Sequence, residues 1–88
     1  MNYLLVHHRV RNFDQWKPLY DAHLPARQQA GVKEVRLLHG ADDPNDVTLL
    51  FEASDLSKAQ VFVASEDLRD VMTKAGVVGT PELTFLKD

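Results

Sequence analysis

The segment YLLVHHRV, residues 3–10, is a nearly continuous run of strand-forming side chains with two adjacent histidines in its middle. Such a run predicts a β-strand, and neighbouring side chains of a strand point to opposite faces of the sheet. Val10 is placed to pack beneath the helix that follows. Counting back in steps of two therefore puts His8 and Val6 on the helix-covered face. His7 then belongs to the other face, unless a bulge shifts the alternation.

A helical region follows this strand. Asn12 is suited to cap a helix that begins near Phe13 and runs to about Gln29, and Gly31 suits the position after its end. Pro25 lies inside this helix. A proline there removes a backbone donor and clashes with the preceding turn, so it either kinks the helix or splits it in two.

Turn-forming and capping residues divide the rest of the chain into shorter elements. The predicted elements are strands over 32–40 and 47–53, a helix from Ser54 or Asp55 to about Ala64, a second helical segment over 66–75 capped by Ser65 and closed by Gly76, a loop over 77–80 (VVGT), and a last strand over 82–87. The order is β-α-β-β-α-β. It predicts an α+β, ferredoxin-like fold, with a four-stranded antiparallel sheet and helices on one face.

Composition limits the class of protein. The chain of 88 residues suits one domain, residues 1–88, and it has no cysteine for disulfides or thiolate chemistry. The net charge of -3, with both signs interspersed, argues against a nucleic-acid partner. No stretch approaches the roughly 18 apolar residues of a membrane span, and the first residues do not look like a leader peptide. We therefore expect a cytoplasmic protein without a membrane partner.

The sheet face without helices is expected to be partly apolar. Alternation places Tyr3, Leu5, Leu50 and Leu86 on it, among charged residues. A monomer would leave these side chains in water, whereas stacking two sheets face to face would bury them in a homodimer. The alternative is an amphipathic sheet with an ordinary solvated face.

Two stretches carry a family resemblance over nearly the whole chain. FDQWKPLYDAH, residues 13–23, and DLSKAQVFVASEDLRDVMTKAGVVGTPELTFL, residues 55–86, resemble the dimeric α+β barrel superfamily, near its antibiotic-biosynthesis monooxygenase-like and cyclase-like members. The resemblance implies the ferredoxin-like fold, a dimer, and a cavity between sheet and helices. It does not imply one reaction, because the superfamily contains oxygenases, isomerases, haem-handling proteins and ligand sensors.

Three polar side chains are predicted to meet inside the monomer. Helical spacing places His23 and Arg27 on the same stripe as Phe13, Leu24 and the aromatic residues, while strand alternation directs His8 back at the helix. A small polar cavity would accommodate them, with Trp16, Tyr20, Phe51 and Phe62 as its ligand-binding, mostly aromatic walls. Alternatively, the histidines and arginine are structural: His8 bonds to backbone, and the other two reach water near the helix end.

The predicted catalytic residues are His8 and His23 for proton transfer and Arg27 for holding an oxyanion. These groups suit an isomerase or cyclase, or a cofactor-free monooxygenase acting on a phenol-like small organic substrate. The alternative is a non-catalytic metabolite-binding or structural dimer module of the same fold. No metal or other cofactor is expected, because His7 and His8 diverge and no two histidines have i, i+4 spacing on a helix.

Overall fold

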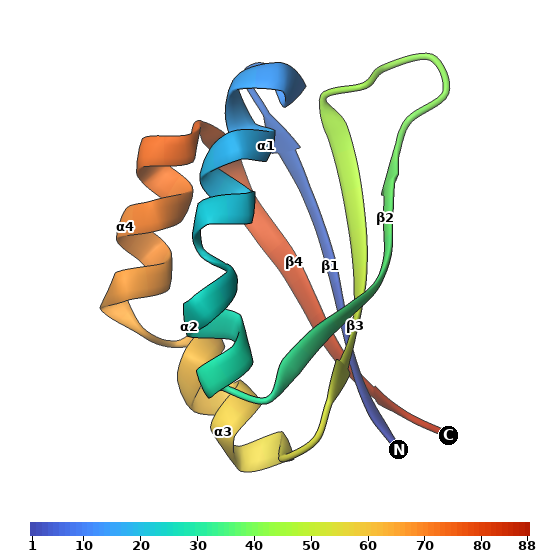
Figure 1. Cartoon of the computed structure of the whole chain (residues 1–88). Coiled ribbons are helices and arrows are strands. Elements are labelled where there is room, and N and C mark those ends of the chain that lie inside the picture. Colours follow the sequence, from blue (N-terminus) through green and yellow to red (C-terminus); the bar gives the residue numbers. More distant parts are fainter.

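The computed structural model describes all 88 residues as a four-stranded antiparallel sheet with helices on one face (Figure 1). The strand order is β2-β3-β1-β4. This confirms the predicted α+β ferredoxin-like fold, except that each helical position is filled by a pair of short helices. The elements are β1 (Asn2–Val10), α1 (Phe13–Ala22), α2 (Leu24–Gln29), β2 (Val32–His39), β3 (Asp46–Ala53), α3 (Leu56–Val63), α4 (Glu66–Ala75) and β4 (Val77–Lys87).

The central strand β1 has the predicted alternation. His8 is buried on the helix-covered face, and His7 lies on the opposite face, where its Nε2 is 2.7 Å from Asp46 Oδ1. The register of β1 against β4 does shift between His7 and Arg9. The extra residues are in β4, however, because His7 pairs with Glu82 and Arg9 pairs with Val78. The alternation of β1 itself is therefore unbroken.

The helix predicted over 13–29 is split in two at His23. This residue ends α1 and precedes α2, with φ -86° and ψ 4°. Pro25 lies in the first turn of α2, where a missing N–H costs nothing because the first helical donors have no partner within the helix. Within one continuous helix, the ring of Pro25 would clash with the carbonyl of Asp21. Leu24, predicted to face the core, follows the split and is exposed.

The prediction of a loop over residues 77–80 is wrong. These residues begin β4, where Val77 pairs with Val10 and Val78 pairs with Arg9. A helix ending at Gly76 in the left-handed conformation (φ 86°) turns the chain directly into the strand. Pro81 falls within the irregular stretch of this edge strand, the kind of position in a sheet that tolerates a missing N–H.

Side-chain caps fix the starts of the longer helices. Asn12 accepts a hydrogen bond from the backbone of Gln15, Asp55 from Lys58, and Ser65 from Leu68. The first two begin α1 and α3, and the third begins α4, as predicted.

The core lies between the sheet and the helices. Its largest fully buried side chains are Leu4 and Val47, from the two central strands. The opposite face of the sheet carries no helix (Figure 1). Leu38 and Leu86 on that face are exposed. The termini meet at one end of the sheet, where the Met1 amino group lies 3.1 Å from Asp88 Oδ1. No helix is long and apolar enough to cross a membrane.

Candidate functional site

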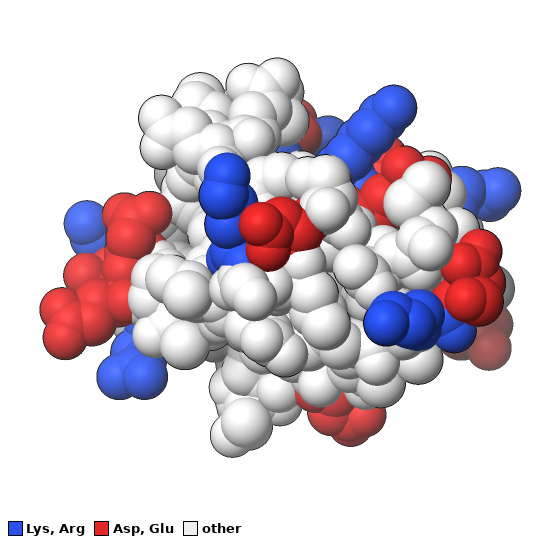
Figure 2. Space-filling view, turned by 90° about the horizontal axis from the view of Figure 1, so that it is seen from below, with Lys and Arg blue, Asp and Glu red and all other residues white.

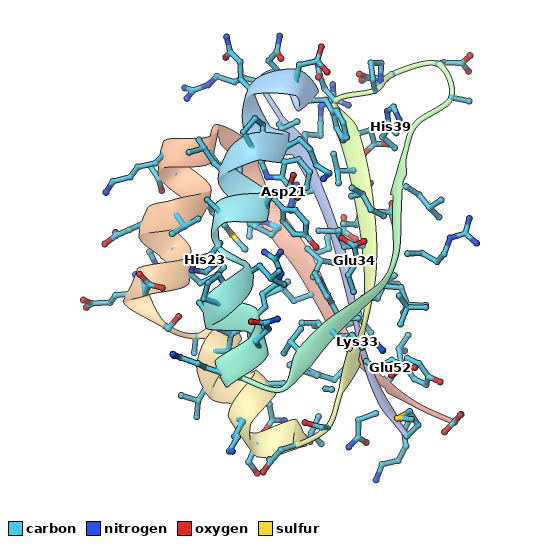
Figure 3. The ribbon with its side chains drawn as sticks, in the orientation of Figure 1. Asp21, His23, Lys33, Glu34, His39 and Glu52 are labelled. Carbon is cyan, nitrogen blue, oxygen red and sulfur yellow. The ribbon has the colours of Figure 1, made fainter.

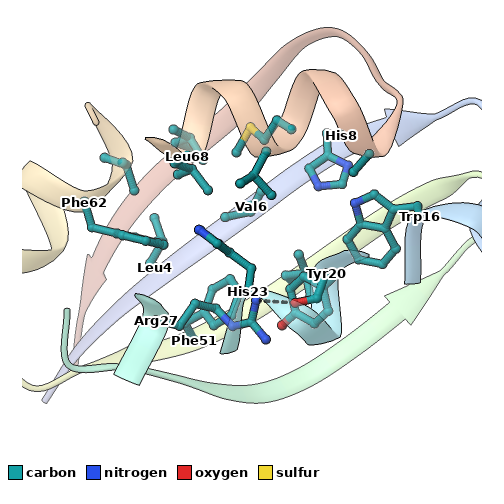
Figure 4. A pocket seen from close by; sticks show the side chains of 16 residues that line it. Leu4, Val6, His8, Trp16, Tyr20, His23, Arg27, Phe51, Phe62 and Leu68 are labelled. Atoms are coloured by element: carbon teal, nitrogen blue, oxygen red, sulfur yellow. Dashed lines mark hydrogen bonds between the residues drawn. The ribbon is translucent and has the colours of Figure 1, made fainter. Parts of the chain in front are cut away.

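A partly enclosed cavity of about 60 Å³ lies between the sheet and the helices (Figure 4). Its walls include all seven predicted site residues, which are His8, Trp16, Tyr20, His23, Arg27, Phe51 and Phe62. The other lining residues are apolar: Leu4, Val6, Leu49, Val63, Leu68, Val71, Met72, Ala75 and Leu83. No aspartate or glutamate lines it. The cavity is therefore a mostly apolar space with three basic side chains in its wall.

Four of these side chains form a continuous stack. The ring of His8 lies edge-on to Trp16 at 5.6 Å between centroids, and Trp16 stacks on Tyr20 at 4.8 Å. The guanidinium carbon of Arg27 lies 3.8 Å from the centroid of the Tyr20 ring. Residues 16 and 20 are one helical turn apart, so α1 aligns both rings over the sheet. The stack links the cation of Arg27 to the imidazole of His8.

Arg27 is held by the break between the helices. The carbonyl of Tyr20 would accept from residue 24 in a continuous helix, but here it accepts from the backbone N–H of His23 and from Arg27 Nη1, at 3.2 and 2.8 Å. Arg27 is only 6% exposed, its Nε has no hydrogen-bond partner, and it takes part in none of the ion pairs of the chain. A buried guanidinium with unused donors and no counter-ion favours an anion beside it.

Tyr20 is fixed at both ends. Its hydroxyl donates to Glu34 Oε1 at 2.7 Å, while its ring contacts Arg27 and Trp16. Burial raises the pKa of Tyr20 well above its usual value of 10.0, and the hydrogen bond to Glu34 raises it further. The side chain therefore remains a neutral hydrogen-bond donor at physiological pH. It acts as a rigid wall, and not as a proton acceptor.

His8 is buried with its Nδ1 unpartnered. Burial lowers the pKa of His8 below its usual value of 6.5; a backbone hydrogen bond opposes this effect, and His7 adds a smaller lowering. The imidazole is thus neutral at pH 7. A neutral imidazole has one nitrogen that accepts a proton, which is the state that general-base chemistry requires.

His23 lies at the α1–α2 junction and reaches toward α4 (Figure 3). Its Nε2 is 3.0 Å from Asp67 Oδ2, and its ring stacks on Phe62 at 5.9 Å between centroids. The Asp67 side chain is largely exposed, whereas that of His23 is mostly covered. A carboxylate on one ring nitrogen sets the tautomer and leaves the other nitrogen available. His23 and His8 share the cavity, but no hydrogen bond joins them.

Sequence reasoning missed two residues of this site. Asp67, whose place in the sequence indicates a solvated face of α4, binds His23. Glu34, which holds the Tyr20 hydroxyl, lies where β2 shifts register against β3, between Glu34 and Arg36. No local pattern marks Glu34, because a bulge interrupts the strand alternation there. For Asp67, the sequence signals only that it lies in the first turn of the helix predicted over 66–75, and not that it contacts His23.

Charges and possible metal ligands are dispersed. No three His, Cys, Asp or Glu side chains come together in a way that could hold a metal ion. Figure 2 views the end of the molecule at which the termini and α3 lie. On that face, Lys and Arg are interspersed with Asp and Glu among larger uncharged areas. This face of the molecule therefore carries both signs of charge.

Comparisons with known proteins identify the fold. No protein-family model and no curated protein matches the chain. Among solved structures, it is similar to an antibiotic biosynthesis monooxygenase, with a TM-score of 0.72 and 15% identity over 100% of this chain and 98% of that one. It is also similar to a variant of SnoaB, a cofactor-independent oxygenase from Streptomyces nogalater, with a TM-score of 0.72 and 16% identity over 99% and 91% of the two chains.

A third similar structure has no assigned activity. It is an uncharacterized NIPSNAP domain protein from Burkholderia xenovorans, with a TM-score of 0.69 and 11% identity over 100% of this chain and 94% of that one. Identities this low show a shared fold and no shared reaction. The chain therefore has the ferredoxin-like fold of the antibiotic biosynthesis monooxygenase-like proteins, as its resemblance to the dimeric α+β barrel superfamily predicted.

Proposed function

We propose that this protein is a small-molecule enzyme that removes a proton from its substrate and holds the resulting oxyanion at Arg27. The observation that carries the proposal is the state of Arg27. It is buried in a cavity wall that contains no carboxylate, and it has unused donors. Burying an unpaired cation is costly, and a bound anion would offset that cost. A preorganised donor in a largely apolar site stabilises developing negative charge more strongly than water does.

The proton acceptor is a histidine of the same cavity. His8 is neutral because burial lowers its pKa, and its Nδ1 has no partner. His23 is oriented by its hydrogen bond to Asp67. In the proposed step, a substrate C–H or O–H bond breaks and its proton moves to one of these imidazoles. The electron pair stays on the substrate as an enolate or phenolate, whose oxygen lies at Arg27.

Two reaction classes follow from such an anion. An enolate, formed when a C–H next to a carbonyl loses its proton, leads to isomerisation or ring closure. A phenolate-type anion reacts with dioxygen without a cofactor. Trp16, Tyr20 and Phe51 would exclude water and protect the anion. The fold likeness to a cofactor-independent oxygenase supports the second class. A non-catalytic binding module would use Arg27 in the same way, and only turnover separates it from an enzyme.

The test is binding and turnover of a panel of phenols and 1,3-diketones. Trp16, the single tryptophan, lies in the cavity wall and reports binding through its fluorescence. Arg27→Gln should weaken binding of the anionic forms about tenfold or more. Its thermal stability should be equal or higher, because an unpaired buried charge is removed. Arg69→Gln, on the exposed side of α4, is the matched control and should leave binding unchanged.

Turnover is followed by oxygen consumption and by loss of the enol or phenol absorbance. His8→Gln and His23→Gln should each lower the rate more than the affinity if that histidine takes the proton. Binding without turnover, lost in Arg27→Gln, would favour the non-catalytic module. Equal binding of every panel member by wild type and Arg27→Gln would contradict the proposal.

A further inference from the structure

The cavity lies beneath the boundary between two pairs of helices, α1–α2 and α3–α4, which we name the helix seam. His23 and Arg27 line it from the first pair, and Phe62 and Met72 line it from the second. Its volume of about 60 Å³ holds a few water molecules, whereas sites for organic ligands usually measure about 300–1,000 Å³. A substrate with an aromatic or multi-carbon body therefore needs the cavity to open.

Two surface hollows lie on the outer side of this seam. The larger, about 550 Å³, is formed mainly by α2 and α3, includes Asp67, and shares the side chain of Phe62 with the cavity. The smaller, about 200 Å³, lies between α1 and α4 and shares His23 and Val71. Phe62 and His23 thus have the cavity on one side and a surface hollow on the other. The partition there is one side chain thick.

Few polar interactions hold the seam closed. The hydrogen bond between His23 and Asp67 is the single side-chain hydrogen bond or ion pair that joins α1–α2 to α3–α4. Asp67 is well exposed, so water competes for its carboxylate and the bond is weak. His23 lies between α1 and α2, and its side chain is held by this hydrogen bond and by its contact with the Phe62 ring. Phe62, stacked on His23, would lose this support when the bond breaks.

We propose that the substrate site extends through this seam, with Phe62 and the His23–Asp67 pair as the partition that opens, and with the hollow between α2 and α3 as the outer part of the site. The ligand class is an elongated organic anion. Its oxyanion end would bind Arg27, and its body would displace Phe62 and extend into the hollow. There it would meet the apolar side chains of Ala30 and Val61 and the polar side chains of Gln29, Ser57 and Lys58. This inference rests on the proposed function for the oxyanion end.

The first experiment measures how easily the cavity opens, without any substrate. Acrylamide is a neutral quencher of tryptophan fluorescence, and Trp16 is only 3% exposed. Asp67→Ala should raise the quenching constant about two- to fivefold, the effect of removing one exposed ion pair. Phe62→Ala should raise it further. Glu66→Ala is the matched control, because it removes an acidic residue of the same first turn of α4 that has no bonded partner.

The second experiment uses 2-naphthoate as the probe, an aromatic carboxylate too large for the closed cavity. Its association rate, followed by stopped-flow fluorescence of Trp16, should rise about two- to fivefold in Asp67→Ala and in Phe62→Ala. Arg27→Gln should instead weaken its affinity and leave acrylamide access unchanged. If Phe62→Ala does not fold, Phe62→Leu and the exposed Asp67→Ala carry the test, with far-ultraviolet circular dichroism as the check on folding.

The two proposals fail in different ways. Folded Asp67→Ala and Phe62 variants with wild-type quenching and association rates would overturn the extended site, even while Arg27→Gln still lost affinity. A rise in quenching in Glu66→Ala as large as in Asp67→Ala would also overturn it, because general loosening of α4 would then be the cause. A rise in Leu83→Ala alone would place the opening at the β4 edge and overturn it as well. Unchanged naphthoate affinity in Arg27→Gln would instead contradict the proposed function.

Discussion

At the scale of single residues, His8 is the most informative side chain. It occupies a position in β1 that an apolar residue would fill without cost, yet it is buried beside Trp16 with Nδ1 unpartnered. A buried polar atom without a partner lowers stability by about 1–3 kcal/mol. His8 and Arg27 both carry such an atom in the wall of one cavity. Two unpartnered polar atoms in one cavity wall distinguish the site from an ordinary apolar core.

The pH dependence of stability gives a test of His8. Because burial lowers the folded pKa of His8, the unfolded state binds more protons between that pKa and the usual value of 6.5. The contribution of His8 therefore destabilises the fold as the pH falls below about 6.5, and it vanishes above that pH. His8→Leu should lessen the loss of melting temperature between pH 7.5 and pH 5.

His39→Leu is the control for this comparison. It also removes one histidine, from an exposed position where the ring stacks on Phe13 at 4.6 Å. Thermal unfolding of the three proteins at both pH values is the measurement. If His39→Leu flattens the pH profile as much as His8→Leu does, His8 is not the source of the effect.

At the scale of elements, α1 is positioned by the aromatic face that it presents to the sheet. Trp16 and Tyr20 are its buried residues, and Trp16 contacts Phe13, Tyr20 and His8. The end of the helix is set by Pro25 through its effect on the preceding turn. One element thus supplies both the aromatic wall of the cavity and, at its broken end, the carbonyl that holds Arg27.

Removing the indole should loosen this element. Trp16→Ala should lower the free energy of unfolding by about 3–5 kcal/mol, because it deletes a large buried side chain and leaves a cavity. Chemical denaturation measures the change. Leu19→Ala, on the 45% exposed side of the same helix, should cost far less. A loss below about 1 kcal/mol for Trp16→Ala would mean that this ring does not fix the helix.

At the scale of the whole molecule, the helices cover one face of the sheet only (Figure 1). The other face combines charged pairs, such as Arg9 with Asp43 at 2.6 Å, with the apolar side chains of Leu38 and Leu86. Leu5 and Leu50 lie opposite each other near its middle. A homodimer in which two sheets stack through this face remains our prediction.

The assembly is tested by analytical ultracentrifugation at micromolar concentration. The wild-type chain should sediment at about twice the monomer mass. Leu50→Glu should shift it toward the monomer by weakening association about tenfold or more, because a charge would enter a desolvated interface. Val61→Glu, 71% exposed on α3 on the helical side, should leave the assembly unchanged. A wild-type protein of monomer mass throughout would contradict the dimer.

The amino-acid sequence by itself determined the features that depend on near neighbours. Two-residue alternation in β1 separated His8 from His7, and the capping side chains of Asn12, Asp55 and Ser65 marked the starts of helices. All seven predicted site residues line one cavity. Strand and helix periodicities place side chains on a face, and these periods are set by local backbone geometry.

Only the tertiary structure decided which side chains meet across elements. Glu34 binds Tyr20, and Asp67 binds His23 from 44 residues away along the chain. Arg27 lies in the cavity although the helix is broken and Leu24 is exposed, because the break frees the carbonyl of Tyr20 to hold it. A small cavity was predicted, but its measured volume of about 60 Å³ was beyond sequence reasoning. Such distances are set by how the helices pack on the sheet, and periodicity specifies a direction but not a separation.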